Sequence, residues 1–132
     1  MSDKISIIVN CFNGEKFLKQ CLESINAQTY QNYEVIFWDN KSNDNSKKIF
    51  KSFENNRFKY FQSDKFTNLS EARNKALSLS TGDYIAFIDV DDIWFNTKLE
   101  EQLFFLKEKN LDITFTNFFT KQEKSKKKKL KK

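Results

Sequence analysis

Three aspartates, Asp89, Asp91 and Asp92, stand within four positions at the end of residues 85–92 (IAFIDVDD). The apolar segment before them is typical of a buried strand, so the acids fall at the C-terminal end of that strand. Clustered carboxylates repel one another unless a cation neutralises them, and Mg²⁺ and Mn²⁺ prefer carboxylate oxygens. The run therefore predicts a site for a hard divalent cation. The alternative is an acidic, solvated turn before a helix.

Several other metal and phosphate motifs are excluded. If Asp89 opened a calcium-binding EF-hand loop, Ile93 and Trp94 would stand where a ligand oxygen and a glycine are required. With only two glycines, neither the dinucleotide fingerprint nor the P-loop can be drawn. The chain has no His, which excludes Ser–His and Cys–His catalysis and His-based zinc sites. Phosphate charge would then be met by a metal ion and a cation. The candidate cation is Arg73, whose alternative role is that of a solvent-facing helix residue.

Strand and helix patterns alternate along the chain, which predicts an α/β fold with a mainly parallel central sheet. Strands are expected at residues 4–10, 33–38, 58–61, 84–88 and 113–116. Helices are expected at 15–28, after an N-cap at Asp44, after a capping box at Asn68–Glu71 and after another at Thr97–Glu100.

Polar clusters follow three of these predicted strands. They are residues 10–13 (NCFN), Asp39 with Asn40, and the acidic run 89–92. The carboxyl ends of parallel strands converge on one edge of a sheet, where ligands bind at the switch point of the strand order. Together the clusters predict a nucleotide pocket with a metal ion beside it.

Composition limits the class of protein. A chain of 132 residues predicts one domain. Residues 121–132 hold eight Lys and one Glu, which leaves residues 1–120 with 15 basic and 17 acidic side chains, a net charge of −2. The body therefore lacks the excess of positive charge expected for nucleic-acid binding. Cys11 and Cys21 are expected to be free, packed thiols, and a cytoplasmic location is the simplest expectation.

Four segments carry a family resemblance: residues 5–13 (ISIIVNCFN), 35–44 (VIFWDNKSND), 72–76 (ARNKA) and 82–92 (GDYIAFIDVDD). In order and spacing they resemble the successive signatures of family 2 glycosyltransferases, over about residues 4–118. The resemblance implies a GT-A fold, a Rossmann-like three-layer sandwich. It also implies a nucleotide-diphospho-sugar donor, Mg²⁺ or Mn²⁺, a glycan or lipid-linked acceptor, and inversion at the anomeric carbon.

The resemblance also implies roles for the residues that bind the base. Asn10, Phe12 and Asn13 would line the base pocket, with Phe12 packing near the base. Asp39 and Asn40 would hydrogen-bond the base. The family often has a second Asp where this chain has Asn40, and an amide both donates and accepts, so the base preference could differ.

On the phosphate side, the resemblance places Arg73 near the diphosphate. Asp89 would face the ribose and the metal's water shell, Asp91 would ligate the metal directly, and Asp92 would follow the metal site. An inverting transferase also needs a general base. In the family this carboxylate lies in the C-terminal, acceptor-binding half, and Glu123 on the Lys-rich segment is a poor candidate, so no catalytic residue is identified here.

We therefore expect a truncated, nucleotide-sugar-binding GT-A domain at residues 1–120, the N-terminal donor-binding part of such an enzyme, and a disordered Lys-rich tail at 121–132. Three interpretations of the tail stay open: a solvated end, a polybasic contact with the inner face of an anionic membrane, and the product of a reading-frame slip. Two alternatives to a transferase also stay open. One is a truncated, catalytically silent module that binds a nucleotide sugar and lacks the acceptor half and the general base, and the other is an adaptor that contacts nucleic acid or membrane through the tail.

Overall fold

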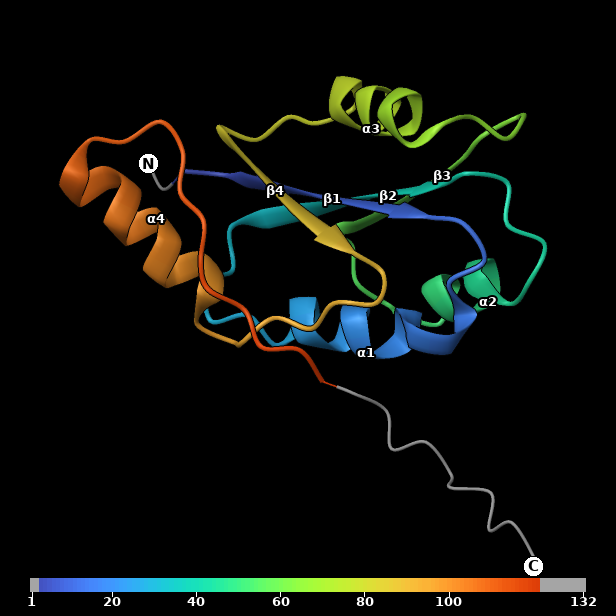
Figure 1. Ribbon diagram of the computed structural model, residues 1–132, viewed down its shortest axis with the longest axis horizontal. Coiled ribbons are helices and arrows are strands. Elements are labelled where there is room, and N and C mark those ends of the chain that lie inside the picture. Colours follow the sequence, from blue (N-terminus) through green and yellow to red (C-terminus); the bar gives the residue numbers. More distant parts are fainter. Residues whose placement is uncertain (1–2, 122–132) are drawn as a thin grey trace, which may run out of the picture.

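The computed structural model describes residues 3–121. Within them, four strands alternate with four helices (Figure 1). In chain order they are β1 (Ile5–Cys11), α1 (Glu15–Asn26), β2 (Tyr33–Asp39), α2 (Ser46–Lys51), β3 (Phe58–Gln62), α3 (Leu69–Ser78), β4 (Tyr84–Asp89) and α4 (Lys98–Lys109). No helix in this part of the chain is both long enough and apolar enough to cross a bilayer.

The four strands form one sheet in the order β3-β2-β1-β4, and each neighbouring pair is parallel. The chain moves from β1 to β2 to β3 in one direction and then returns through α3 to the other side of β1. The strand order therefore reverses between β1 and β4, where the register pairs Asn10 with Asp89. The predicted α/β fold and parallel sheet are confirmed, and this reversal is the switch point at which such sheets bind ligands.

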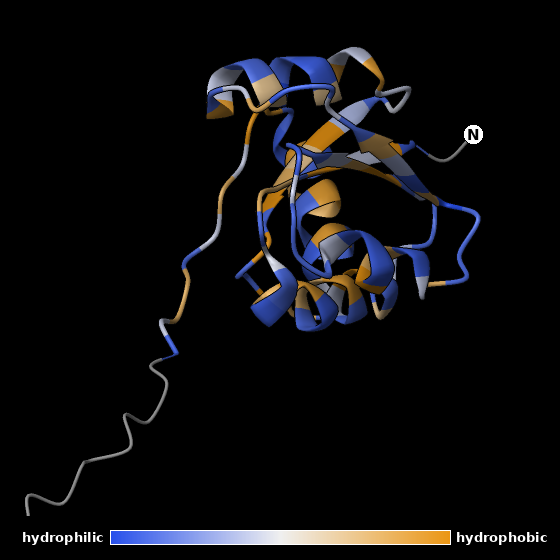
Figure 2. Cartoon of the chain, turned by 90° about the vertical axis from the view of Figure 1, so that its right-hand side faces the viewer, coloured by the Kyte–Doolittle hydropathy of each residue, from blue (hydrophilic) through white to orange (hydrophobic). Residues whose placement is uncertain are grey.

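Helices cover both faces of the sheet, α3 on one face and α1 with α2 on the other (Figure 1). Alternate residues of each strand point to opposite faces. In β1, Ile7 and Val9 enter the main core with apolar residues of α1, α2 and α4, whereas Ile8 packs under α3. Many apolar residues lie in the sheet and on the helices beside it, and several more are exposed in the extended segment that follows α4 (Figure 2). Since α3 contacts β1 and β2, the β4 side chains Ile85 and Phe87 stay partly exposed on its face.

A buried carboxylate ties the strands together at the end of the sheet opposite the polar clusters. Glu34 of β2, 2% exposed, accepts hydrogen bonds from Ser6 Oγ (2.7 Å), Lys59 Nζ (2.6 Å) and Lys4 Nζ (3.1 Å). It also accepts from the Thr81 amide (2.8 Å) and hydroxyl (2.9 Å), in the turn before β4. One side chain thereby connects the starts of β1, β2 and β3 to the turn that leads into β4.

Three local expectations were wrong. The N-cap position of α2 is Asn45, one residue after the expected Asp44, although the Asp44 side chain does accept from the amide of Ser46, the first residue of α2, and from that of Glu15 in α1. At α4, Thr97 makes no side-chain cap. Residues 113–116 form no strand in the described part of the chain. Their alternating pattern is that of a strand, but a strand needs a neighbour, and no described strand pairs with them.

The capping box at Asn68 is confirmed in its main bond, since the Asn68 side chain accepts from the Glu71 amide at 2.9 Å. Ala72 and Ala76 are the buried residues of this helix, α3. The Lys-rich tail predicted at 121–132 lies, from residue 122 on, outside the described residues.

Candidate functional site

The acidic run forms a turn at the C-terminal end of β4. The Asp92 amide donates to the Asp89 carbonyl oxygen at 3.0 Å. Val90 points inward against the core. It lies so close to Gly14 that a Cβ added to Gly14 would be 3.0 Å from the Val90 side chain. With Val90 held inside, Asp89, Asp91 and Asp92 are exposed, and one carboxylate oxygen from each lies within 4.8 Å of the others. The predicted acidic cluster is therefore brought together by the fold.

The electrostatics of the cluster suit a cation. Burial raises the pKa of Asp92, and the neighbouring charges of Asp89 and Asp91 raise it further. Arg73 of α3 places Nη2 3.5 Å from Asp89 Oδ1, with its guanidinium 5.8 Å from the centre of the Phe87 ring. The side chains of Arg73 and Asp89 are 40% and 65% exposed, so this ion pair is solvated and weak. Three hard oxygen donors beside one exposed cation would suit Mg²⁺ or Mn²⁺.

Asp39 and Asn40, at the end of β2, point into the protein. Asp39 is 1% exposed, and it accepts from the Ser42 amide at 2.7 Å and from the Tyr60 hydroxyl. Asn40 is 6% exposed and exchanges hydrogen bonds with the amide, hydroxyl and carbonyl of Thr67. In this conformation the two side chains hold the loops that follow β2 and β3. Tyr60 and Thr67 were not anticipated as their partners, because these bonds join segments more than 20 residues apart.

Asn10 lies between β2 and β4 at the switch point, in register with Trp38 and Asp89. Its Oδ1 atom is buried with no hydrogen-bond partner among the described residues, and the same is true of Trp38 Nε1. Buried polar atoms are nearly always paired in native proteins. The buried acceptor of Asn10 therefore still needs a hydrogen-bond partner, such as a water molecule, that the described residues do not supply.

Asn13 joins the loop after β1 to the loop after β2. It adopts a left-handed conformation (φ 50°). Its amide donates to Ser42 Oγ at 2.9 Å, and its Oδ1 accepts from the Asn43 amide at 2.8 Å. A parallel bond runs from the Gly14 amide to Ser46 Oγ at 3.0 Å. These bonds hold the loop after β1 and the loop after β2 against each other.

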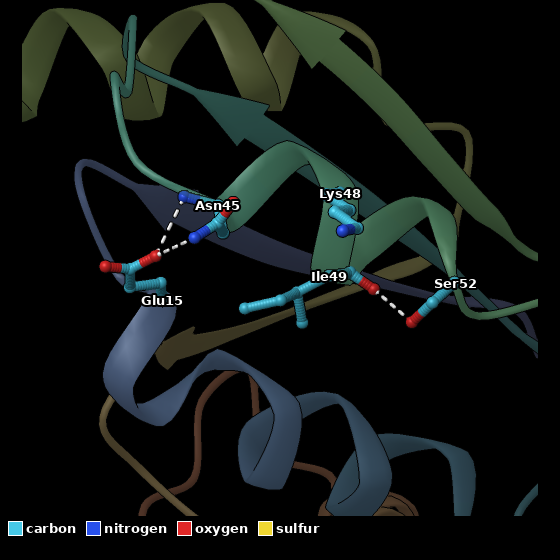
Figure 3. A pocket seen from close by; sticks show the side chains of 5 residues that line it. All are labelled: Glu15, Asn45, Lys48, Ile49 and Ser52. Atoms are coloured by element: carbon cyan, nitrogen blue, oxygen red, sulfur yellow. Dashed lines mark hydrogen bonds between the residues drawn. The ribbon is translucent and has the colours of Figure 1, made fainter.

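A surface hollow beside this edge lies between the starts of α1 and α2 (Figure 3). Glu15 Oε2 accepts there from the backbone and side-chain nitrogens of Asn45, at 2.9 and 2.8 Å. The other residues that line the hollow are Lys48, Ile49 and Ser52. The bonds across this hollow join two helices, and it contains none of the aspartates of the cluster.

Phe12 lies beyond β1 as expected and is 51% exposed, with its ring against that of Phe66. Phe66 was not anticipated, because nothing in the local pattern of residues 63–67 distinguishes it.

The two cysteines are free and buried, as expected. Burial raises the pKa of Cys21 to about 12, and its Sγ lies 3.7 Å from the Asp89 carbonyl oxygen, so this thiol supports the turn and is chemically inert.

Comparison with known proteins places these features in one family. A family model described as glycosyl transferase family 2 matches residues 6–132. The glycosyltransferase GlyG of Streptococcus pneumoniae serotype 4 is 34% identical over 125 residues, which are 93% of this chain and 42% of GlyG. The Escherichia coli protein WfgD, named as a UDP-Glc:alpha-D-GlcNAc-diphosphoundecaprenol beta-1,3-glucosyltransferase, is 33% identical over 86% of this chain and 45% of its own length.

Solved structures agree in fold. S. aureus TarS, residues 1–349, crystallised in complex with UDP-GlcNAc, matches with a TM-score of 0.76 and 28% identity, over 80% of this chain and 31% of the TarS chain. A mannosyltransferase from Pyrobaculum calidifontis matches with a TM-score of 0.73 at 20% identity, over 80% of this chain and 33% of that one. The chain spans less than half the length of the curated relatives described above.

Proposed function

Because the chain belongs to glycosyl transferase family 2, with the GT-A fold, we propose that it binds a nucleotide-diphospho-sugar together with Mg²⁺ or Mn²⁺ and transfers the sugar to a glycan or lipid-linked acceptor. The observation that carries the proposal is the cluster of Asp89, Asp91 and Asp92 at the switch point, with Arg73 beside it. Sheet topology, hard oxygen donors and a nearby cation together match what a nucleoside diphosphate requires.

In this proposal each residue at the edge has a defined task. Asp91, with Asp89, holds the divalent cation, which when bound neutralises charge that grows on the leaving nucleoside diphosphate. Arg73 contributes a second positive charge near the phosphates. Asn10 and Phe12 line the base pocket, where Phe12 offers ring surface to the base, and Asp89 also faces the ribose. Holding both halves of the donor in one crevice orients the anomeric carbon for attack, with inversion as the family resemblance implies.

The donor and acceptor classes are supported by similar proteins. TarS was crystallised with UDP-GlcNAc and with UDP, and WfgD is named for a diphosphoundecaprenol-linked acceptor. We extend a nucleotide-sugar donor and a lipid-linked acceptor to this chain on that basis. A lipid-linked acceptor would place the protein in the cytoplasm at the inner membrane, where the Lys-rich segment 121–132 could contact anionic lipid. Co-sedimentation with anionic vesicles, with and without residues 121–132, tests that contact.

The cation assignment is tested with a matched pair of variants. Asp91→Ala removes a direct ligand, and Asp112→Ala removes an exposed aspartate that follows α4. Since loss of an outer-shell partner of a metal costs about 10- to 100-fold in affinity, loss of a direct ligand should weaken Mn²⁺ binding at least about tenfold. Asp112→Ala should bind Mn²⁺ as the wild type does. Equal Mn²⁺ affinity in the two variants, with both folded by circular dichroism, would exclude Asp91 as a ligand.

A second candidate is a module that binds the donor without transferring the sugar. The observation in its favour concerns the contacts made by the five aspartates at and after the ends of β2 and β4. Asp39 and Asp44 are occupied by protein hydrogen bonds, and the other three form the cation cluster, so none of these five is available as a general base. Incubation with donor, Mn²⁺ and a lipid-linked acceptor separates the two candidates. Release of nucleoside diphosphate that depends on the acceptor supports transfer, and donor binding without release supports the module.

A further inference from the structure

Phe12 and Phe66 form an exposed aromatic pair at the C-terminal edge of the sheet. Phe12 follows β1, and Phe66 lies in the loop between β3 and α3. Their ring centroids are 4.7 Å apart, and the rings meet edge to face at 63°. Phe12 is nevertheless 51% exposed and Phe66 59% exposed. The contact between them therefore leaves about half of each side chain open to solvent, beside the proposed nucleotide pocket.

The loop that carries Phe66 is anchored by buried hydrogen bonds. The Ser63 amide donates to the Asp39 carbonyl oxygen at 2.8 Å. The Thr67 amide and hydroxyl each donate to Asn40 Oδ1 at 3.1 Å, and Asn40 Nδ2 donates to the Thr67 carbonyl oxygen at 2.7 Å. Asn40, Ser63 and Thr67 are all buried. Phe66 is therefore exposed directly beside Thr67, whose backbone is held by Asn40. These bonds keep Phe66 close to the ends of β1 and β2.

The position of the pair relative to the cation cluster defines what it can contact. The cation cluster lies at the end of β4, and the aromatic pair lies at the ends of β1 and β2. In the sheet β1 stands between β2 and β4, so the cluster and the pair are neighbours along the same edge. A nucleoside diphosphate with its phosphates at Asp91 would extend its base across β1 toward β2. Two rings at 63° form a corner in which a flat ligand can stack on one ring and meet the edge of the other.

We propose that Phe66 is a binding residue for the nucleobase of the donor, acting with Phe12 as one wall of the base pocket. Stacking on an aromatic ring tolerates any base, because each base has a π-face. Phe66 would therefore set the affinity for the nucleoside, and the buried Asn40–Thr67 bonds would set where Phe66 stands. This inference rests on the proposed function, and it adds a contact from a loop outside the four family signatures.

The test distinguishes the contribution of the base to binding from that of the phosphates. UDP, GDP and inorganic pyrophosphate, each with Mn²⁺, are titrated into the full chain by calorimetry. Phe66→Ala should weaken binding of the tighter nucleoside diphosphate about 5- to 150-fold, the range measured for loss of one base–aromatic stack. Pyrophosphate binding should stay unchanged, because pyrophosphate has no base. Phe66→Tyr should retain wild-type affinity, and Phe66→Leu, which keeps an apolar side chain in the loop, should weaken binding as Phe66→Ala does.

Phe104→Ala is the matched control, since Phe104 is 67% exposed on α4. It should bind every probe as the wild type does. Wild-type UDP and GDP affinity in Phe66→Ala overturns the inference and leaves the proposed function intact. An equal loss of pyrophosphate affinity in Phe66→Ala also overturns the inference, because Phe66 would then affect the binding of the phosphates and not that of the base. If the wild type binds neither nucleotide with Mn²⁺, the proposed function fails and the inference fails with it.

Discussion

Glu34 provides a sharp test of how the sheet is held together. Its carboxylate is 2% exposed and accepts five hydrogen bonds, two of them from the partly exposed ammonium groups of Lys4 and Lys59. Burial alone would raise the pKa of Glu34, but hydrogen bonds from Lys59, Ser6 and Thr81 outweigh burial and hold that pKa well below its usual range. Glu34→Gln keeps the size of the side chain, removes the charge and turns an amide N–H₂ toward donors.

We expect Glu34→Gln to lower the free energy of unfolding at pH 7 by about 2–4 kcal/mol. Hydrogen bonds to a charged group are worth about 1.5–3 kcal/mol each, and breaking a buried ion pair costs about 3–5 kcal/mol. The partial exposure of Lys4 and Lys59 reduces that cost. Because the pKa of Glu34 is lowered by folding, its stabilisation is present above the ordinary carboxyl pKa and is lost as the pH falls toward the folded value. The difference between wild type and variant should narrow by about 1–2 kcal/mol at pH 3.

Urea unfolding followed by circular dichroism at pH 7 and pH 3 measures both effects. Glu23→Gln is the matched control, because Glu23 is 56% exposed and lies 3.9 Å from Lys19. The control should change the free energy of unfolding by less than about 0.5 kcal/mol. Folded Glu34→Gln should bind UDP as the wild type does, since Glu34 lies at the opposite end of the sheet from the cation cluster. A variant as stable as the wild type at pH 7 would refute the reasoning.

Two further changes test the packing of the strands. Tyr60→Phe removes the hydroxyl that donates to the buried Asp39, and should cost about 1–3 kcal/mol in urea unfolding. Burial and the Asp39 carboxylate raise the pKa of Tyr60, so in an alkaline absorbance titration the signal that is lost in Tyr60→Phe should lie above the pH at which free tyrosine ionises, and ionisation at the pH of free tyrosine would contradict the bond. Gly82→Ala would place a Cβ 2.6 Å from the Ser6 amide nitrogen, and should cost about 1–3 kcal/mol. An unchanged melting temperature in Gly82→Ala would show that this contact is absent.

The sequence predicted the features of this fold that depend on local pattern. Apolar runs followed by polar residues identified β1, β2 and β4, and the alternation of strands and helices implied a parallel sheet whose strand ends converge. The structure confirms that convergence, since Asn10 and Asp89 are register partners. The acidic cluster was predictable for the same reason, because its members lie within four positions of one another.

Features that depend on contacts between distant segments were not predictable. Glu34 stands in an apolar strand, and only the folded chain shows that Lys4, Lys59 and Thr81 converge on it. Asp39 lies where expected, but local pattern could not show that Ser42 and Tyr60 occupy both of its oxygens.

Capping preferences failed where side chains found distant partners. Glu100 was expected to complete a capping box with Thr97, but its carboxylate accepts from the Thr29 hydroxyl at 2.9 Å. Asp44 was expected at the N-cap of α2, but that position is Asn45; Asp44 still accepts from the Ser46 amide at the start of α2, and its other oxygen accepts from the Glu15 amide. A cap is worth about 1 kcal/mol, so tertiary hydrogen bonds of similar energy can replace it.

The most direct test of the central claim is a calorimetric titration of the wild-type chain with a panel of nucleotide-diphospho-sugars, with and without Mn²⁺. The panel should include UDP- and GDP-linked sugars, with Asp91→Ala as the control protein. The account predicts that one donor binds in the presence of Mn²⁺ and that this binding is lost without the metal and in Asp91→Ala. Binding of no donor, or binding indifferent to both Mn²⁺ and Asp91, would contradict it.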